Sequence, residues 1–295
     1  MKGMTTHLHI SPMLKSDLKN HIERQQGFTI HSMRPLTGGD INQVGLLDTD
    51  HGKIVIKIND AQQFPGMFAA EKTGLDTLRR VNAIHIPRAV ACGAVDDTSY
   101  LLLEYIEPGT KQSGFWEVFG HQLAQLHKTG NDFFGFCQNN YIGSLPQYNN
   151  QEQYAVDLYI NQRLKPQFKM ASANGYHFDN LDNFYAHLHN IIPDEPPALV
   201  HGDLWGGNYL VDYQGNPVLI DPATAYAPRE MDIAMMHLFG GFDPRLFVAY
   251  HSVFPLQTGW QDRIKLWQLY YILVHLNLFG HSYLASAKAI IAHYR

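Results

Sequence analysis

Three polar side chains that can contact a metal or a reacting hydroxyl lie in one stretch of the chain. The run His201-Gly202-Asp203-Leu204-Trp205-Gly206-Gly207-Asn208 places Asp203 and Asn208 five residues apart in a glycine-rich loop. A β-run, residues 217–220, follows and leads into Asp221. A carboxylate such as Asp203 can take the proton of a hydroxyl, and carboxylate and amide oxygens are suitable ligands for Mg²⁺.

The order of these residues is typical of the catalytic loop of kinases and of the metal-binding aspartate that follows it. Phosphoryl transfer needs a carboxylate beside the acceptor hydroxyl and a Mg²⁺ ion that bridges the nucleotide phosphates. The pattern therefore favours Asp203 as base, with Asn208 and Asp221 as metal ligands. The alternative is a glycine-rich turn with solvated acids, which a His-Gly-Asp tripeptide alone would leave favoured. His201 is expected to brace the loop.

A second group of candidate residues lies upstream, where a lysine interrupts an apolar strand. Lys57 lies in the run Ile54-Val55-Ile56-Lys57-Ile58, and a helix-like segment, residues 67–81, carries Glu71. A lysine in such a strand needs a partner or pays for its desolvation. A strand lysine followed by a helix glutamate matches the ion pair that orients nucleotide phosphates in kinases. The alternative is an edge-strand lysine that points to solvent.

Two further segments complete the expected nucleotide site. Gly38 and Gly39 lie between two predicted strands, where glycine lets backbone N–H groups approach phosphates, although a plain hairpin turn would look similar. The strand at residues 99–104 breaks into Pro108-Gly109, which is typical of a hinge between domains. In a two-lobed kinase this hinge contacts adenine, so Glu104 and Ile106 are candidate nucleotide-binding residues.

The elements that must position these residues change in type along the chain. Strands are expected at residues 29–36, 41–47, 53–58, 89–94 and 99–104, after one amphipathic helix carrying Leu14, Leu18 and Ile22. Helical patterns dominate later and are expected at residues 116–126, 154–170, 181–192, 231–239, 244–254, 264–279 and 282–294. We therefore expect an α+β, two-lobed protein-kinase-like fold. Its β-rich N-lobe spans 1–104, its hinge 105–110 and its helical C-lobe 111–295.

Composition excludes several other classes of function. The 295 residues carry a formal net charge of −5 without any basic run, so a nucleic-acid partner is not expected. Two separate cysteines, Cys92 and Cys137, argue against a disulfide framework and fit a reducing cytoplasm. No secretory signal or membrane-spanning stretch is expected. The 17 histidines show no H-E-x-x-H motif and are expected to be scattered surface or core residues.

The chain resembles the fructosamine kinase (ketosamine-3-kinase) family, within the aminoglycoside phosphotransferase and choline kinase group. The residues that carry the resemblance are spread over much of the chain. They are HGDLWGGN at 201–208, IDPA at 220–223, REMDIAMMHLFGGF at 229–242, YIGSLPQYNN at 141–150, RL at 163–164 and LVHLNLFGHSY at 273–283.

The resemblance implies ATP-dependent phosphorylation of the 3-hydroxyl of a ketosamine, free or protein-bound, which would promote deglycation and so repair glycated amines. It implies Asp203 as catalytic base, Asn208 and Asp221 as Mg²⁺ ligands and Lys57 on the phosphates of ATP. Trp205, beside two glycines in the loop, is expected to wall the acceptor pocket, and its alternative role is packing beneath the loop.

One turn departs from the pattern of the family, and several questions of function stay open. Ala227-Pro228 replaces the Gly-Asp that the family tends to have before Arg229-Glu230, which puts a role of that turn in doubt. The rival functions are a kinase of another hydroxyl acceptor, such as an aminoglycoside, choline or a sugar, and a nucleotide-binding pseudokinase scaffold. The sequence leaves the natural adduct and the oligomeric state open, with a monomer favoured.

Overall fold

The computed structural model describes residues 14–36 and 41–295, so the expected glycine loop at Gly38 and Gly39 lies outside the described residues. The chain divides into two compact units. The first runs to Lys72 and resumes over Arg88–Tyr105, and the second comprises Thr73–Pro87 and Ile106–Arg295. Residues 73–87 therefore group with the second unit by their contacts. The functional lobe boundaries stay a prediction.

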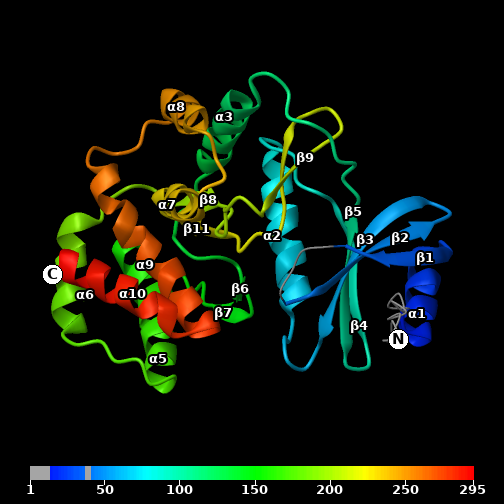
Figure 1. Cartoon of the computed structure of the whole chain (residues 1–295), viewed down its shortest axis with the longest axis horizontal. Helices are drawn as coiled ribbons and strands as arrows, with labels where there is room; N and C mark the ends of the chain where they lie inside the picture. Colours follow the sequence, from blue (N-terminus) through cyan, green and yellow to red (C-terminus); the bar gives the residue numbers. More distant parts are fainter. Residues whose placement is uncertain (1–13, 37–40) are drawn as a thin grey trace, which may run out of the picture. The chain divides into compact units, whose positions relative to one another are not determined.

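The first unit is built on one antiparallel sheet with the strand order β1-β2-β3-β5-β4 (Figure 1). Strand β3 lies in the middle and pairs with β2 on one side and β5 on the other. The elements are α1 (Ser16–Gln26), β1 (Ile30–Pro35), β2 (Gln43–Thr49), β3 (Gly52–Asp60), β4 (Ala89–Val95), β5 (Thr98–Glu104) and the start of α2 (Met67–Val81).

The apolar core of the first unit forms between the sheet and α1. Leu18 and Ile22, one helical turn apart, are buried together with Ile56 of β3 and Leu102 of β5. Residues four apart lie on the same face of a helix, so this i, i+4 pattern gives α1 one apolar face. The helix and the sheet cover each other at this face.

The second unit is mainly helical, with three short antiparallel strand pairs. The strand pairs are β6 (Asn140–Ile142) with β7 (Leu145–Gln147), β8 (Ala198–Val200) with β11 (Ala225–Ala227), and β9 (Tyr209–Val211) with β10 (Pro217–Leu219). The helices are α3 (Phe115–His127), α4 (Ala155–Asp157), α5 (Lys165–Ala173), α6 (Leu181–Ile191), α7 (Glu230–Phe239), α8 (Pro244–Val253), α9 (Trp260–Phe279) and α10 (Leu284–His293).

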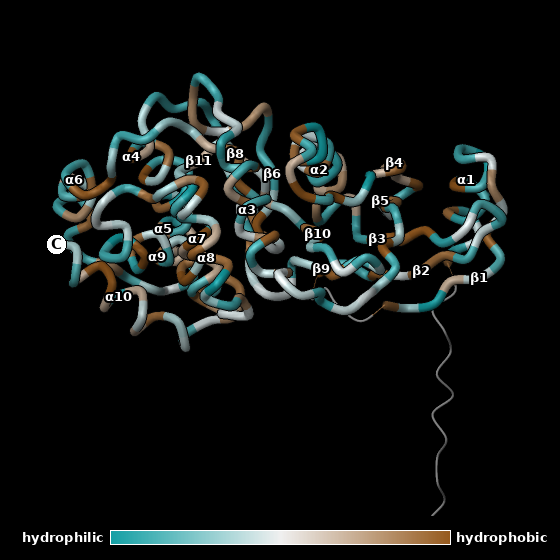
Figure 2. Tube along the Cα trace, turned by 90° about the horizontal axis from the view of Figure 1, so that it is seen from above, coloured by the Kyte–Doolittle hydropathy of each residue, from teal (hydrophilic) through white to brown (hydrophobic). Residues whose placement is uncertain are grey.

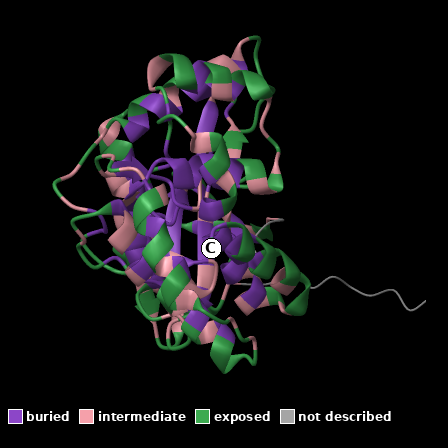
Figure 3. Cartoon of the chain, turned by 90° about the vertical axis from the view of Figure 1, so that its left-hand side faces the viewer, coloured by how far each residue is buried: buried purple, intermediate pink, exposed green. Residues whose placement is uncertain are grey.

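Helix α9 is the central helix of this unit and packs against α5, α7 and α10 (Figure 1). Trp267, Leu269 and Leu273 have no measurable exposure, and a large apolar cluster surrounds them. Figure 3, coloured by burial, shows exposed residues on the outside and buried residues in the interior. The helices therefore share one core around α9.

The helix expected over residues 154–170 is interrupted. A π-helical segment, Leu158–Leu164, separates α4 from α5. Pro166 follows at the start of α5, and proline cannot donate the backbone hydrogen bond that would continue a regular α-helix through this turn. The wider turn immediately before Pro166 accommodates that missing bond.

Hydropathy varies over short distances along the chain (Figure 2). Within residues 14–36 and 41–295, no helix combines the length and the apolar character that a membrane span requires. Even α9, with 20 residues, carries charged residues in its first two turns.

Helices α3 and α8 lie close together at a glycine. A Cβ atom at Gly120 would meet the backbone of α8 at Leu246 and Tyr250 and the Cβ of Ala249. Backbone atoms of a packed helix cannot move aside as a flexible side chain can, so glycine is the residue that this contact accepts.

We expect Gly120→Ala to destabilise the protein. Overpacking typically costs about 1–3 kcal/mol, and the better helix propensity of alanine returns up to about 1 kcal/mol. Urea unfolding should therefore show a lower free energy of unfolding. Val118→Ala, at an exposed position of the same helix, is the matched control. Equal stability of the two variants would contradict close packing at Gly120.

Candidate active site

The polar loop at residues 201–208 connects β8 to β9 in the second unit. Strand β10 pairs antiparallel with β9 and brings Leu219 opposite Tyr209. The chain continues beside the loop, because the Ile220 N–H donates to the Asn208 carbonyl at 3.1 Å. Asp221 thus returns to the loop that contains Asp203 and Asn208, as the β-run before it predicted.

Asn208 connects the two acidic residues. Its Nδ2 donates to the Asp203 carbonyl at 2.8 Å and to the Asp203 carboxylate at 3.1 Å, and it lies 3.5 Å from the Asp221 carbonyl. Asn208 is buried and Asp203 is half-buried. The structure therefore brings together the three residues that the sequence singled out in this loop.

The environment of Asp203 favours proton transfer near neutral pH. Desolvation raises the pKa of its carboxyl to about 7, the Asn208 hydrogen bond opposes this rise, and the charges of Asp221 and Asp232 add to it. A base works best when its pKa lies near the working pH. Asp203 therefore has the affinity for a proton that a base acting near neutral pH needs, and its role as the base stays a prediction.

The residues beside Asp203 fit a magnesium ion that would be coordinated partly by the protein and partly by phosphate oxygens. Because Asn208 Nδ2 is committed to the oxygens of Asp203, its Oδ1 is the amide atom left to accept, and the backbone of Asp221 lies beside the same side chain. No group of three or more His, Cys, Asp or Glu able to hold a metal occurs in the described part of the chain. Mg²⁺ typically takes one or two protein oxygens and completes its shell with phosphate and water.

The predicted Lys57–Glu71 ion pair is present in the first unit. Lys57 Nζ lies 2.6 Å from a Glu71 carboxylate oxygen, and both side chains are largely buried. Because β3 is a central strand, Lys57 is not an edge-strand lysine. Glu104 ends β5, where its backbone N–H and its carboxylate both bond Arg88, and Ile106 is buried at the start of the next unit. Nucleotide binding by these four residues stays a prediction.

The chain is similar in sequence to known kinases. The sequence profile of the fructosamine kinase family matches residues 14–295. The chain belongs to this family. A probable ketoamine kinase of Enterococcus faecium is 38% identical over 266 residues, covering 88% of this chain and 94% of the relative. The ketosamine-3-kinase of Mus musculus is 32% identical over 286 residues, covering 86% and 92%.

Solved structures agree with the family assignment. A putative fructosamine-3-kinase from Haemophilus somnus superimposes with a TM-score of 0.85 at 25% identity, covering 94% of this chain and 96% of the other. An aminoglycoside phosphotransferase shares the fold with a TM-score of 0.60 at 15% identity over 94% and 98%. The expected α+β, protein-kinase-like fold is confirmed.

A carboxylate from α7 holds the loop at residues 201–208 of this fructosamine kinase family member. Asp232 accepts from the backbone N–H groups of His201 at 2.7 Å and Gly202 at 2.8 Å, and it lies 3.1 Å from His127 Nε2. Burial alone would raise the pKa of Asp232, but the hydrogen bond and charge of His127, with His201 and the Gly202 N–H, lower it overall. Asp232 therefore acts as a buried anion that fixes the start of the loop.

His201 and Gly202 link the loop to the segment around Asp221. Burial lowers the pKa of His201, so its neutral ring donates from Nε2 to the Ile220 carbonyl at 2.8 Å, and the Asp203 N–H donates to Nδ1 at 3.3 Å. Gly202 has φ +85° and rests on the Ala223 backbone, where a Cβ atom would overlap the carbonyl. His201 thus braces the loop, as expected from the sequence.

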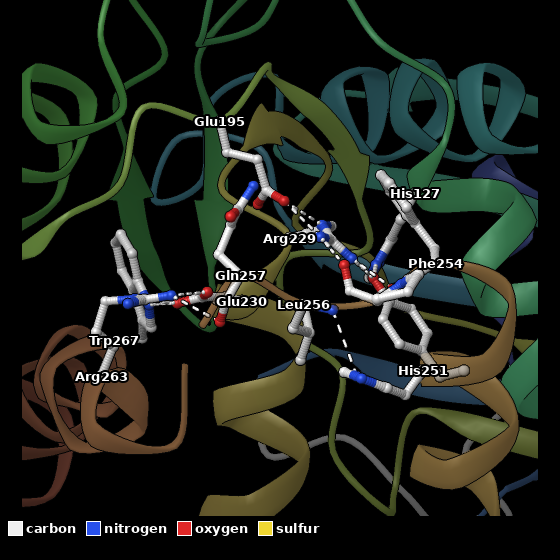
Figure 4. Close-up of polar contacts among 12 residues, drawn as sticks. His127, Glu195, Arg229, Glu230, His251, Phe254, Leu256, Gln257, Arg263 and Trp267 are labelled. Atoms are coloured by element: carbon white, nitrogen blue, oxygen red, sulfur yellow. Dashed lines mark hydrogen bonds and ion pairs between the residues drawn. The ribbon is translucent and has the colours of Figure 1, made fainter. Parts of the chain in front are cut away.

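Two buried ion pairs anchor the N-terminus of α7 (Figure 4). Arg229 pairs with Glu195 and also donates to the carbonyls of Phe254 and Pro255. Its neighbour Glu230 accepts from Arg263 at 2.6 Å and from the Trp267 indole at 2.7 Å. These contacts hold the first turn of the helix that carries Asp232, and they do not involve Ala227 or Pro228.

Buried amides of the β6–β7 hairpin hold the other side of the Asp221 segment. Gln147 Nε2 donates to the Ala223 carbonyl at 3.0 Å, and Asn140 Nδ2 donates to the Thr224 carbonyl at 2.9 Å. Tyr270 of α9 donates to Gln147 Oε1 at 2.8 Å. The side chains of Gln147, Asn140 and Tyr270 therefore fix the backbone of the segment after Asp221.

Sequence analysis did not assign roles to Asp232, Gln147 or Asn140. Asp232 and Gln147 lie in strings that carried the family resemblance, which was the available signal, and Asn140 directly precedes one of those strings. Their partners are 30 or more residues away along the chain, so no local spacing marks the contact.

Trp205 has features of both roles considered for it, packing within the loop and exposure to an acceptor. Its ring folds back over Gly207, where a Cβ atom would overlap the indole, yet 42% of the residue is exposed. The neighbouring Gly206 packs on the backbone of Gly240 and Gly241. An exposed ring at this place is accessible to an acceptor, and its role stays a prediction.

We expect Asp232→Asn to lower both stability and turnover. Replacing one carboxylate oxygen with an NH₂ group leaves a donor facing a backbone N–H, and an unsatisfied buried group costs about 1–3 kcal/mol. Thermal and urea unfolding, with steady-state kinetics, measure the two effects. Asp182→Asn, on the exposed face of α6, removes the same charge as control. A variant with the stability and turnover of that control would contradict the bracing role.

Proposed function

We propose that this protein transfers the γ-phosphoryl group of ATP to the 3-hydroxyl of a ketosamine. The observation that carries the proposal is that Asn208 contacts both Asp203 and the backbone of Asp221, and that burial raises the pKa of Asp203. Membership of the fructosamine kinase family supports the same chemistry.

Each residue has a distinct role in the proposed reaction. Asp203 accepts the proton of the acceptor hydroxyl as that oxygen attacks phosphorus. Asn208 orients the Asp203 carboxylate through Nδ2 and offers Oδ1, together with Asp221, to Mg²⁺. When bound, the ion neutralises charge on the transferring phosphoryl group. Lys57, oriented by Glu71, contacts the phosphates of ATP.

The remaining nucleotide contacts are part of the same proposal. Gly38 and Gly39 cover the phosphates, and the backbone near Glu104 and Ile106 contacts adenine. The N-lobe then spans residues 1–104, the hinge 105–110 and the C-lobe 111–295. A cytoplasmic location, a monomeric state and the lack of a nucleic-acid partner are also predictions.

The acceptor class is supported by the names of relatives and by the chemistry of glycation. The mouse relative is a ketosamine-3-kinase, and a relative from Arabidopsis thaliana, 34% identical over 269 residues, is a chloroplastic protein-ribulosamine 3-kinase. Phosphate at carbon 3 lies beside the carbonyl of carbon 2. Enolisation toward carbon 1 makes that phosphate an allylic leaving group, so its loss destabilises the adduct and frees the amine.

An ADP-release assay with different acceptors tests this function. We expect MgATP turnover with fructosyl-lysine or ribulosyl-lysine to exceed turnover with fructose, choline and an aminoglycoside at equal concentration. Faster turnover with any of those three acceptors would overturn the ketosamine assignment. ATP binding without turnover on any acceptor would favour a pseudokinase.

Asp203→Asn separates catalysis from nucleotide binding. Loss of a general base typically lowers turnover ~10²–10⁴-fold, whereas calorimetry should show nearly unchanged MgATP affinity because the carboxylate acts on the acceptor. Asp182→Asn again controls for the lost charge. Turnover within a few-fold of wild type would show that Asp203 is not the base.

Trp205→Ala tests the acceptor wall. Full burial of an aromatic side chain is worth ~1.5–3 kcal/mol, so KM for the ketosamine should rise about tenfold or more while KM for ATP changes little. Trp205→Phe should restore much of the affinity, and Tyr213→Ala, at another exposed aromatic position, is the control. Equal rises for both substrates would favour a packing role.

A further inference from the structure

A lysine ammonium lies over three aromatic rings beside the catalytic loop. Lys111 Nζ is 4.1 Å from the centroid of the Trp116 ring, 5.3 Å from that of Tyr209 and 5.4 Å from that of Phe115. It also donates to the Tyr209 hydroxyl at 3.0 Å. We call Phe115, Trp116 and Tyr209 the aromatic cage. Aromatic cages of this kind bind organic ammonium groups through the negative face of each ring.

The cage is supported independently of the lysine that fills it. Phe119 and Phe242 lie behind it, with ring centroids 5.4 and 5.5 Å from Tyr209. Phe115 and Phe119 are buried, whereas Trp116, Tyr209 and Phe242 are half-buried, so the cage has a fixed wall and an open side. Ring packing of this kind does not require a cation.

Lys111 itself is held loosely by comparison. It is exposed and lies in the irregular segment that precedes α3. Within the described residues it makes no ion pair with a carboxylate. Its contacts are the cage rings and the Tyr209 hydroxyl, and its charge also helps to lower the pKa of Asp243. Another ammonium group could take its place over the rings, and one that carries an N–H could also donate to the Tyr209 hydroxyl.

The cage adjoins the proposed active site through Tyr209. This residue directly follows Asn208, and its hydroxyl lies 3.4 Å from the Gly241 carbonyl. The Gly241 backbone packs on Gly206 of the catalytic loop, next to Trp205. A ligand ammonium in the cage would therefore lie against the loop that carries the proposed base Asp203 and the proposed metal ligand Asn208.

We propose that the aromatic cage is a binding subsite for an organic ammonium of the acceptor and that Lys111 is a displaceable stand-in for it. This inference rests on the proposed function, because a lysine-derived ketosamine carries a protonated secondary amine on a lysine chain. The ligand class is a lysine-like side chain with a protonated or methylated nitrogen. The cage would select amine-bearing acceptors over neutral sugars.

A direct binding measurement tests the cage without turnover. The probe is Nα-acetyl-Nε-trimethyl-lysine amide, and Nα-acetyl-norleucine amide is its uncharged partner, both titrated by calorimetry. Vacating the cage with Lys111→Ala should tighten probe binding about tenfold and leave the norleucine compound without measurable affinity. Adding Trp116→Leu should abolish that gain, whereas Lys128→Ala, which removes a lysine over the single ring of Phe254, should not change affinity.

Several outcomes would overturn the inference. Unchanged probe affinity in Lys111→Ala, or equal binding of the norleucine compound, would show that the cage only packs the lysine against α3. If Trp116→Leu unfolds the protein, Tyr209→Leu replaces it, with circular dichroism as the folding control. If the probe binds as expected but no ketosamine is phosphorylated, the proposed function is wrong, whereas binding of an ammonium group by the cage is supported.

Discussion

The loop at residues 201–208 depends on one buried carboxylate that accepts hydrogen bonds from two consecutive backbone N–H groups. Asp232 binds the amides of His201 and Gly202, and His127 contacts the same carboxylate. Without this acceptor two buried N–H groups would lose their partner, at a cost of about 1–3 kcal/mol for each unsatisfied group. These hydrogen bonds fix the backbone directly before Asp203. The ion pairs of Arg229 and Glu230 hold α7, the helix that carries Asp232 (Figure 4).

The second constraint acts on the segment that follows Asp221. Amides of Gln147 and Asn140 hold the carbonyls of residues 223 and 224, and Gly202 packs directly on residue 223. The two halves of the site therefore meet through backbone contact rather than through side chains alone. A site positioned in this way can keep the proposed base and the two proposed metal ligands in place before any substrate binds.

Features that depend on residues close together in the sequence could be predicted, whereas contacts between distant residues could not. Strand and helix periodicity is local, so β3, α2 and the Lys57–Glu71 pair could be predicted, and the strand before Asp221 predicted its return to the loop. The three-residue strands β6, β7 and β11 are too short for a periodic signal. Asp232 and Gln147 act through partners distant in the sequence, and the π-helical turn before Pro166 interrupts a pattern that reads as one helix. Gly38 and Gly39 lie outside the described residues.

The central claim is that this site delivers phosphate to the hydroxyl at carbon 3 of a ketosamine. The position of the new phosphoester tests it most directly. Fructosyl-lysine incubated with MgATP should yield one product whose phosphorus, in ³¹P–¹H correlation NMR, couples to the proton on carbon 3, with later release of inorganic phosphate and free lysine. Coupling to protons of another sugar carbon, or ADP formation without any phosphoester, would contradict the account.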